Sequence, residues 1–287
     1  MISRVTGAAR PLGAADVTDG RELSVGSTET ILVDRRDGVV TVTLNRPERK
    51  NAANGQMWQE LLETFAEVAH QRQDRVLVVT GAGGAFCSGA DIADPSGVSG
   101  DPADPHLVRM RFLGEVMLAL HELPKPTIAK IGGIAAGAGL SLALQCDLTV
   151  ASQSARFSEI FSRRGLSVDG GSSWLLPRLV GLHRAKELAY FADILSADEA
   201  AAIGLVNRVV PDAELDAFVD DWADRLATGP PLALSMSKRL LNNGSLVTMA
   251  QALEDEATSQ TVNFFTADTA EAMRAFAEKR EPHFEGR

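Results

Sequence analysis

The fold of this chain is decided by two glycine-rich stretches, GAFCSGAD at residues 84–91 and GGIAAGAG at residues 132–139. Each follows a run of β-branched and apolar residues, at 76–80 and at 127–131, that is typical of a buried strand. A glycine-rich bend after a strand leaves backbone N–H groups free to hold an anion, and two such bends brought together would form an oxyanion hole. Alternatively, the glycines serve only the close packing of helix on strand.

Strands and helices alternate on both sides of these stretches. The sequence predicts further strands at 31–33, 39–44 and 148–151, and helices over 55–70, 112–120 and 140–145. This alternation indicates an α/β core with parallel strand pairing, which we place at residues 29–211. From about Asp212 onward the apolar spacing is helical, so residues 212–287 form a predicted helical region. Residues 1–28 are predicted to be a flexible tail.

Composition and charge narrow the classes of function. Of 287 residues, 45% are hydrophobic and 23% are charged, as expected for a globular protein with a substantial core. The formal net charge of −10 opposes binding to phosphate backbones and anionic lipids, so we expect no nucleic-acid partner. No run approaches about 20 apolar residues, and the first 28 residues lack the apolar segment of a signal peptide. We therefore expect no membrane insertion.

Several common motifs are missing from the sequence. Cys87 and Cys146 cannot build a disulfide scaffold and fit free thiols in the cytoplasm. The five histidines are scattered, so we expect no metal site. Residues 137–142 lack the third glycine of a dinucleotide-binding loop, and neither a lysine-bearing phosphate loop nor a Gly-x-Ser-x-Gly elbow is present.

Further stretches carry a resemblance to a known family. They are NRP at 45–47, NA at 51–52, CD at 146–147, LLPRLVG at 175–181 and AFAEKR at 275–280. Together with the two glycine-rich stretches, and in this order and spacing, they make the chain resemble the crotonase superfamily, the enoyl-CoA hydratases and isomerases. The resemblance spans about residues 29–284.

The resemblance implies a fold and a shared chemistry. The fold is a spiral of ββα units followed by a helical C-terminal region that builds oligomers, so a homotrimer or hexamer is expected. The shared chemistry is stabilisation of a thioester enolate by two backbone amides, and the matching positions here are Ala90 and Ala138. The family commonly has glycine at the second position, and alanine keeps the amide donor.

The resemblance also implies an acyl-CoA thioester as substrate, with coenzyme A as part of the substrate and no separate cofactor. The residues it assigns to CoA lie after the Arg-Pro pair, after Ala90, and near the C-terminus of a neighbouring subunit: Arg49, Lys50, Asp91, Ile92, Phe276 and Lys279. Basic side chains facing the CoA phosphates make physical sense on an acidic protein. Alternatively, Arg49 and Lys50 are solvated loop charges. The side chain of Asp91 is expected to cap a helix near the hole.

The departures from the family pattern bear on the reaction. Hydratases of this family use two glutamates, and the matching positions here are Ser141 and Phe161. Glu159 lies two residues before Phe161, in a run expected to be extended, about 6–7 Å away along the strand. Without either glutamate, water addition lacks the general acid and base that are worth about 10²–10⁴ in rate.

One acid remains well placed by the resemblance. Asp169 lies in the bend GLSVDGG at 165–171, where some double-bond isomerases of the family carry a single catalytic aspartate. In an apolar pocket its pKa should be raised. Alternatively, Asp169 only caps a helix that begins near Ser172.

These observations favour an acyl-CoA isomerase of fatty-acid metabolism, with Asp169 as the base. The alternatives are an enoyl-CoA hydratase that uses Glu159 or Asp169, and a non-catalytic acyl-CoA-binding protein that keeps the hole. The acyl pocket is expected to be shaped by the loop at 93–106 and by the helix carrying Met110, Phe112, Leu113 and Met117.

Overall fold

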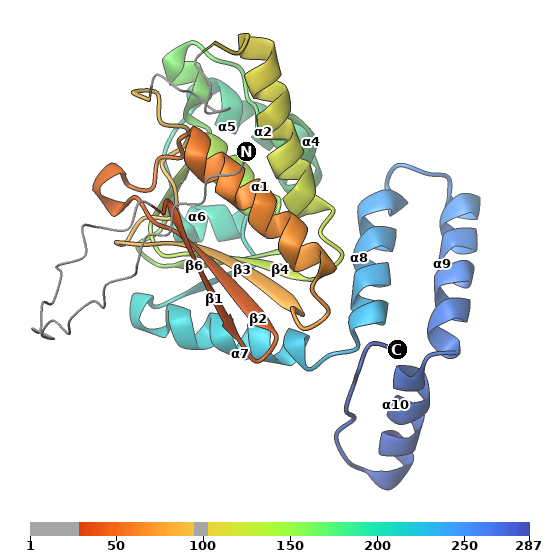
Figure 1. Ribbon diagram of the computed structural model, residues 1–287. Helices are drawn as coiled ribbons and strands as arrows, with labels where there is room; N and C mark the ends of the chain where they lie inside the picture. Colours follow the sequence, from red (N-terminus) through yellow and green to blue (C-terminus); the bar gives the residue numbers. More distant parts are fainter. Residues whose placement is uncertain (1–28, 95–102) are drawn as a thin grey trace, which may run out of the picture.

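The computed structural model describes residues 29–94 and 103–287. The tail expected at 1–28 and residues 95–102 of the loop expected at 93–106 lie outside the described residues. The described part is a mixed α/β structure with a helical C-terminal region, which confirms the predicted fold class (Figure 1).

The larger sheet has six strands in the order β1-β2-β3-β4-β6-β9. Their bounds are β1 Ile31–Arg36, β2 Val39–Leu44, β3 Val76–Gly81, β4 Thr127–Ile131, β6 Leu148–Ser152 and β9 Arg208–Val210. The β1–β2 hairpin is antiparallel, turning at Asp37 and Gly38, whose φ angles are 52° and 85°. All other neighbours pair in parallel, as the alternation of strands and helices predicts.

A smaller sheet of three short strands lies beside the first, in the order β5-β7-β8. Its strands are β5 Ile134–Ala136, β7 Arg156–Ser158 and β8 Leu195–Ser196. β5 leaves the end of β4 across Gly132 and Gly133, so the second glycine-rich stretch connects the two sheets. This placement brings the stretch to the carboxyl end of the parallel strands, where ligands bind in open α/β sheets.

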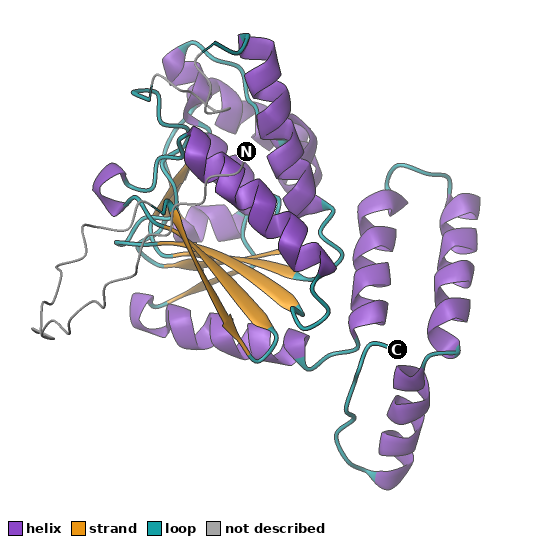
Figure 2. Ribbon diagram, in the orientation of Figure 1, coloured by secondary structure: helices purple, strands orange, loops and turns teal. Residues whose placement is uncertain are grey.

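Helices cover both faces of the larger sheet (Figure 2). The longer ones are α1 Gly55–His70, α2 His106–His121, α4 Ser172–Val180, α5 Leu182–Phe191 and α7 Leu215–Ala227, and the shorter ones are α3 Ala138–Leu144 and α6 Ala197–Ala202. The main apolar core includes Trp58 and Phe65 of α1, while a second cluster joins Val219 of α7 to Val78 and Ile128 on the other face. α7 therefore belongs to the packed core.

The remaining three helices form an arm beside the core (Figure 1). They are α8 Pro231–Gly244, α9 Met249–Phe264 and α10 Ala267–Glu278. Pro230 and Pro231 separate α7 from α8, where proline at the first helical position suits a helix start. In the described ranges no helix is both long and apolar enough to cross a bilayer.

Candidate active site

The two glycine-rich stretches lie side by side. The backbone N–H groups of Phe86 and Cys87 both donate to the carbonyl of Ile134 at 3.0 Å, and the N–H of Ala136 donates to the carbonyl of Cys87 at 2.9 Å. Cys87 and Ala135 form a parallel bridge. The bends predicted from separate parts of the sequence therefore meet at one place.

Glycine is required at the contact between the two stretches. A Cβ at Gly139 would lie 2.3 Å from the carbonyl oxygen of Cys87, and a Cβ at Gly133 would lie 2.0 Å from the carbonyl oxygen of Gly84. Real Cβ atoms cannot approach an oxygen so closely, so any larger residue would push the strands apart. Close packing of the two stretches is compatible with a hole, because it also brings Gly89 next to the backbone nitrogen of Ala138.

The two amides expected to form the hole are available. Ala138 is the first residue of α3, directly after Gly137 with φ of 52°, so its N–H has no partner within the helix. Among the described residues, no acceptor bonds the N–H of Ala90 or of Ala138. A Cβ built on Gly89 would lie 3.8 Å from the backbone nitrogen of Ala138, so the residue before Ala90 lies next to that amide.

Phe161 lies beside this pair of amides. Its ring comes within 3.8 Å of the place that a Cβ on Gly137 would take, and only 5% of Phe161 is exposed. The position that matches a glutamate in hydratases therefore holds an apolar wall, which excludes water from this side.

Asp169 begins a tight turn that leads into α4. Gly170 and Gly171 follow it with φ angles of 58° and 89°, a backbone that side chains rarely adopt. The N-cap residue of α4 is Gly171, and no side chain caps the helix, so Asp169 is not a helix cap. Its Oδ1 is buried without a hydrogen-bond partner, and burial raises the pKa of Asp169 to about 6.

Helix α3 clamps the turn that carries Asp169. The hydroxyl of Ser141 donates to the carbonyl of Asp169 at 3.1 Å, and the amide Nε2 of Gln145 donates to the carbonyl of Gly170 at 2.7 Å. A Cβ at Gly170 would lie 2.7 Å from the Cβ of Ser141, so the turn touches the helix. Because α3 also begins with Ala138, one helix positions both the hole and the carboxyl group.

The run at 157–159 is extended only as far as Ser158, so the prediction is confirmed for the first two residues and was wrong for Glu159. β7 ends at Ser158, and the 3₁₀ helix η2 (Ile160–Arg164) begins directly after Glu159, so the chain bends there and strand spacing does not relate Glu159 to Phe161. Glu159 is 1% exposed, its Oε1 accepts from the hydroxyl of Ser172 at 3.3 Å, and its Oε2 has no partner. Burial raises the pKa of Glu159 to about 8.

The side chain of Asp91 does not cap a helix, because residues 92–93 form a turn. Its carboxylate accepts from Arg46 Nη2 at 2.9 Å and from the N–H of Ala93 at 3.1 Å. Burial alone would raise the pKa of Asp91, but the bonds from Arg46 and Ala93 hold it below its ordinary value. Asp91 therefore fixes the strand-like segment through Ala90 to the Arg46 loop.

The residues assigned to CoA fall in two places. Arg49, Lys50 and Ile92 are exposed next to the hole, and the N–H of Ser88 donates to the carbonyl of Lys50 at 3.0 Å. Phe276 lies on α10 and Lys279 follows its last residue, and α10 is at the end of the arm, away from that loop (Figure 1). Within one chain the two groups do not meet.

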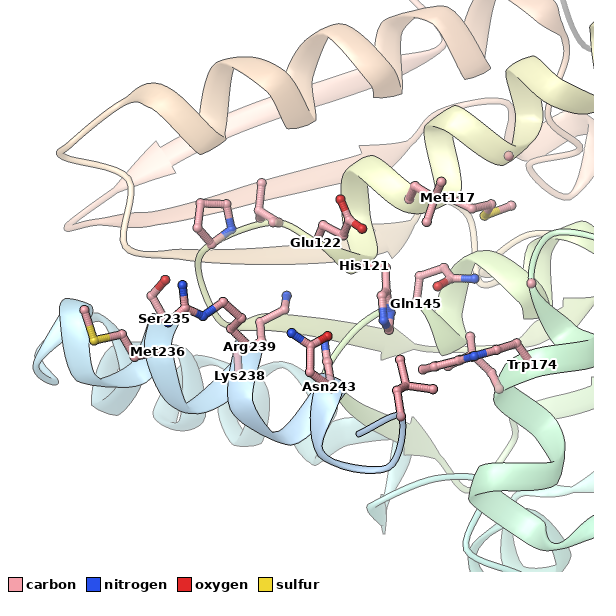
Figure 3. A pocket seen from close by; sticks show the side chains of 18 residues that line it. Met117, His121, Glu122, Gln145, Trp174, Ser235, Met236, Lys238, Arg239 and Asn243 are labelled. Atoms are coloured by element: carbon pink, nitrogen blue, oxygen red, sulfur yellow. The ribbon is translucent and has the colours of Figure 1, made fainter. Parts of the chain in front are cut away.

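A cavity of about 810 Å³ lies between α2, α4 and α8 (Figure 3). Met117 and Trp174 line it from the core, and Lys238 and Arg239 line it from α8. Lys238 is paired with Asp147 at 3.0 Å, so its charge is neutralised. Met117 Cε also lies 3.2 Å from the place of a Cβ on Gly170, so this cavity adjoins the turn of Asp169.

The helix expected to shape the acyl pocket contributes in part. Met117 of α2 lines the cavity, whereas Leu113 is 1% exposed and lies in the apolar core. Among the residues that the structure describes, no group of three or more His, Cys, Asp or Glu side chains could hold a metal ion.

Sequence reasoning missed the polar residues that hold the segments carrying the two acids. Ser141, Gln145 and Ser172 are ordinary residues on apolar helices, and their function depends on contacts between segments about 25 to 31 residues apart. One signal was present, namely serine in place of a glutamate at residue 141, a small residue that leaves room for another segment.

Comparisons with known proteins agree with this geometry. A family model described as enoyl-CoA hydratase/isomerase matches residues 34–287. A 1,2-epoxyphenylacetyl-CoA isomerase of Escherichia coli is 39% identical over 260 residues, which covers 90% of this chain and 99% of that protein. A probable enoyl-CoA hydratase of Rhodobacter capsulatus is 38% identical, covering 91% of this chain and 100% of that protein.

A solved structure shows the same fold. The crystal structure of an enoyl-CoA hydratase from Bacillus anthracis superposes with a TM-score of 0.85 at 32% identity, covering 90% of this chain and 100% of that one. The similarity to both isomerases and hydratases leaves the choice of reaction to the residues of the site.

Proposed function

This chain belongs to the enoyl-CoA hydratase/isomerase family and acts on acyl-CoA thioesters, and on that premise we propose that it isomerises the double bond of an enoyl-CoA. In this reaction a 3-enoyl-CoA becomes the conjugated 2-enoyl-CoA, and Asp169 carries the proton. We further propose that it works in the cytoplasm, in fatty-acid metabolism.

The observation that carries the proposal is the state of the Asp169 carboxyl group. Its Oδ1 is buried without a partner, and the next residue, Gly170, lies against Met117 of the cavity wall. With a pKa of about 6, most of it is ionised at neutral pH while the proton, once taken, is readily returned. An isomerase needs one such group, since the same carboxyl can accept and donate.

The proposed isomerisation consists of two proton transfers by the same carboxyl group. The Asp169 carboxylate takes a proton from the α-carbon, and the electron pair of that C–H bond moves into the thioester, whose oxygen becomes the oxyanion of a dienolate. The N–H groups of Ala90 and Ala138 donate to that oxygen, a type of donor worth about 10²–10³ in rate each. The Asp169 acid then gives its proton to the γ-carbon, and the double bond comes to rest between the α- and β-carbons.

Hydration is the alternative reaction. It needs one group to activate water and another to protonate the α-carbon. The candidate carboxyls are Glu159 and Asp169, but with a pKa of about 8 Glu159 is mostly protonated at neutral pH and bonded to Ser172. That state suits a proton donor and not a base, so hydration would leave water activation to Asp169. Loss of chemistry altogether, with acyl-CoA binding retained, is a further alternative.

We also propose that Arg49 and Lys50, with the backbone at Asp91 and Ile92, bind CoA together with Phe276 and Lys279 of a neighbouring subunit in a homotrimer or hexamer. Large apolar side chains on the arm support an assembly, since 80–86% of Leu241, Phe265 and Phe276 is exposed in the single chain. Sedimentation at micromolar concentration checks this, and a monomer would contradict it.

The experiment that tests the reaction uses two substrates and two readouts. Purified protein is incubated separately with a 3-enoyl-CoA and a 2-enoyl-CoA, while the absorbance of the conjugated thioester is followed and product masses are measured. Isomerisation predicts new conjugated absorbance from the 3-enoyl-CoA with no change in mass. A product heavier by one water would indicate a hydratase, and no product from either substrate would support the binding protein.

A further inference from the structure

We infer that Arg46 is a positioning residue for the backbone amide of Ala90, and that it acts by clamping the single bridge that orients this amide. The inference rests on the proposed function, because it concerns one of the two donors proposed for the oxyanion hole. Arg46 belongs to the NRP stretch at 45–47, and the proposed steps give it no role.

The direction of the Ala90 amide is fixed by Ala53. The N–H of Ala53 donates to the carbonyl of Gly89 at 2.8 Å, and the N–H of Asp91 donates to the carbonyl of Ala53 at 2.9 Å. The carbonyl of Gly89 and the N–H of Ala90 belong to one planar trans peptide, in which they point in opposite directions. The bond from Ala53 therefore turns the N–H of Ala90 away from residue 53 and leaves it available to a ligand.

The link between the two segments is one residue long. Ala53 and Ala90 form an isolated parallel bridge outside both sheets. A strand within a sheet is held by a ladder of backbone bonds, whereas two bonds hold this amide in its direction. Because a hydrogen bond weakens steeply when its angle changes, the alignment of the amide depends on further contacts that hold the bridge.

The guanidinium group of Arg46 spans this bridge. Its Nη1 donates to the carbonyl of Ala52, and its Nη2 donates to the carboxylate of Asp91 at 2.9 Å. Ala52 and Asp91 are chain neighbours of the two bridged residues, so one side chain holds both sides of the bridge. Only 17% of the Arg46 side chain and 10% of the Asp91 side chain is exposed, so water and salt screen this ion pair weakly.

Arg46 is itself held in place by Asn51. The side-chain oxygen of Asn51 accepts from the N–H of Arg46 at 2.9 Å, and its Nδ2 donates to the carbonyls of Ala82 and Ala85 at 2.8 and 2.9 Å. Asn51 is fully buried and has a φ of 55°, a left-handed conformation that asparagine adopts more readily than most residues. The backbone of Arg46 is therefore fixed to the first glycine-rich stretch and to the turn before it.

This geometry separates the role of Arg46 from the binding of CoA phosphates. The guanidinium bonds of Arg46 go to the protein chain itself, and the side chain is mostly buried. Arg49 and Lys50, by contrast, are exposed. We therefore expect the loss of Arg46 to change the alignment of the amide, and with it kcat, and to leave KM nearly unchanged.

The kinetic test compares Arg46→Met with Arg46→Lys on a 3-enoyl-CoA at pH 7. Methionine cannot donate, so kcat should fall by about 10–10² with KM within about threefold. Lysine keeps the charge but lacks the planar fork that bonds two partners, so it should recover kcat in part. Wild-type kcat in Arg46→Met overturns the inference, and so does a loss confined to KM, which would place Arg46 in CoA binding.

A matched control breaks an ion pair far from the hole. Arg35 pairs with the buried Asp74 at 3.4 Å and lies beside the first residues of β2, at the sheet edge opposite to the hole. Arg35→Met should lose stability in urea unfolding, as Arg46→Met does, and keep wild-type kcat. An equal loss of kcat in the two variants would trace both to general destabilisation and overturns the inference.

A milder variant carries the kinetic test if Arg46→Met does not fold. Asp91→Asn keeps the shape of the side chain but removes its charge, so its bond with Arg46 is weakened. We expect kcat to fall by about three- to tenfold, with KM nearly unchanged. Wild-type kcat in a folded Asp91→Asn overturns the inference.

A further readout does not depend on turnover. Hydrogen bonds to a thioester carbonyl lower its stretching frequency, so butyryl-CoA with an isotopic label at that carbon reports the hole in an infrared difference spectrum. At saturating ligand we expect a shift to lower frequency in the wild type and a smaller shift in Arg46→Met. Equal shifts overturn the inference, and so does a wild type without a shift. If the shifts differ as expected but no 3-enoyl-CoA is turned over, the proposed reaction fails alone.

Discussion

The proposed oxyanion hole and the carboxyl cluster both involve the short helix α3, but the hole is built from backbone and the cluster from side chains. The hole consists of backbone, held by contacts such as that of Gly139 against Cys87, where a single Cβ would not fit. The cluster consists of two acids together with the hydroxyls and the amide that bond Glu159 and the backbone carbonyls of Asp169 and Gly170. A backbone site tolerates changes of the side chains that its own residues carry, whereas the cluster changes with each substitution.

This difference would allow the chain to keep the enolate-stabilising amides of its family while the residues that transfer protons change. The amides proposed for the hole, those of Ala90 and Ala138, need the right bends, and the glycines supply them. The identity of the acids depends on which segment reaches the hole, and at residue 141 a serine makes room for the turn of Asp169. We therefore expect the side-chain half of the site to decide the reaction.

Removal of the Asp169 carboxylate should have the largest effect on kcat, and it tests the side-chain half of the site. Asp169→Asn keeps shape but cannot accept a proton, so we expect kcat to fall by about 10²–10⁴ with little change in KM. Steady-state kinetics on a 3-enoyl-CoA at pH 7 measures this, with Glu159→Gln as the matched control. Larger loss in the glutamine variant would exchange the roles of the two acids.

Removal of one hole amide should have the next largest effect and tests the backbone half. Ala138 is the first residue of α3, where proline fits the helix, so Ala138→Pro deletes the N–H and leaves the helix in place. We expect kcat to fall by about 10²–10³. Ala138→Gly keeps the donor and should stay close to wild type, and normal turnover by a folded proline variant would rule out this amide.

A smaller effect on stability should distinguish the strain of a positive φ angle from the contact between α3 and the turn of Asp169. Gly170 and Gly165 both have positive φ, but only a Cβ at Gly170 would meet a neighbour, 2.7 Å from the Cβ of Ser141, while a Cβ at Gly165 meets nothing within 4 Å. Gly170→Ala should cost about 1–3 kcal/mol more than Gly165→Ala in urea unfolding and lower kcat about tenfold. Equal costs would show that α3 does not clamp the turn.

The mildest test changes only the pH. Because burial raises the pKa of Asp169 to about 6, the ionised base is lost as the pH falls below that value. We expect kcat/KM to decrease about tenfold per pH unit below pH 6, as the free enzyme becomes protonated. A flat profile down to pH 5, with a protein that remains folded, would remove Asp169 from the rate-limiting proton transfer.

Much of this architecture could be predicted because local rules decide it. The alternation of strands and helices, the glycine bends and the proline start of α8 follow from short-range patterns. The bend after Ser158 could not be predicted, since a polar residue between apolar ones fits a strand equally well. Nor could the burial of Glu159, which depends on Ser172 reaching it from a segment 13 residues away.

What covers the apolar faces of the arm could not be predicted from the sequence. Its helices were predicted from apolar spacing, but a stripe of apolar residues does not say what covers it. α7 uses its stripe to pack on the larger sheet, whereas Phe276 of α10 remains 86% exposed in the single chain.

The central claim is that one carboxyl group carries the proton from the α-carbon to the γ-carbon of an enolate held by backbone amides. It is tested most directly with a 3-enoyl-CoA deuterated at the α-carbon and reacted in ordinary water, with the position of the label read by NMR and mass spectrometry. We predict that part of the deuterium appears at the γ-carbon of the 2-enoyl-CoA product, and that Asp169→Asn abolishes this transfer. Product without any label at the γ-carbon, or formation of a hydroxyacyl-CoA in its place, would contradict the account.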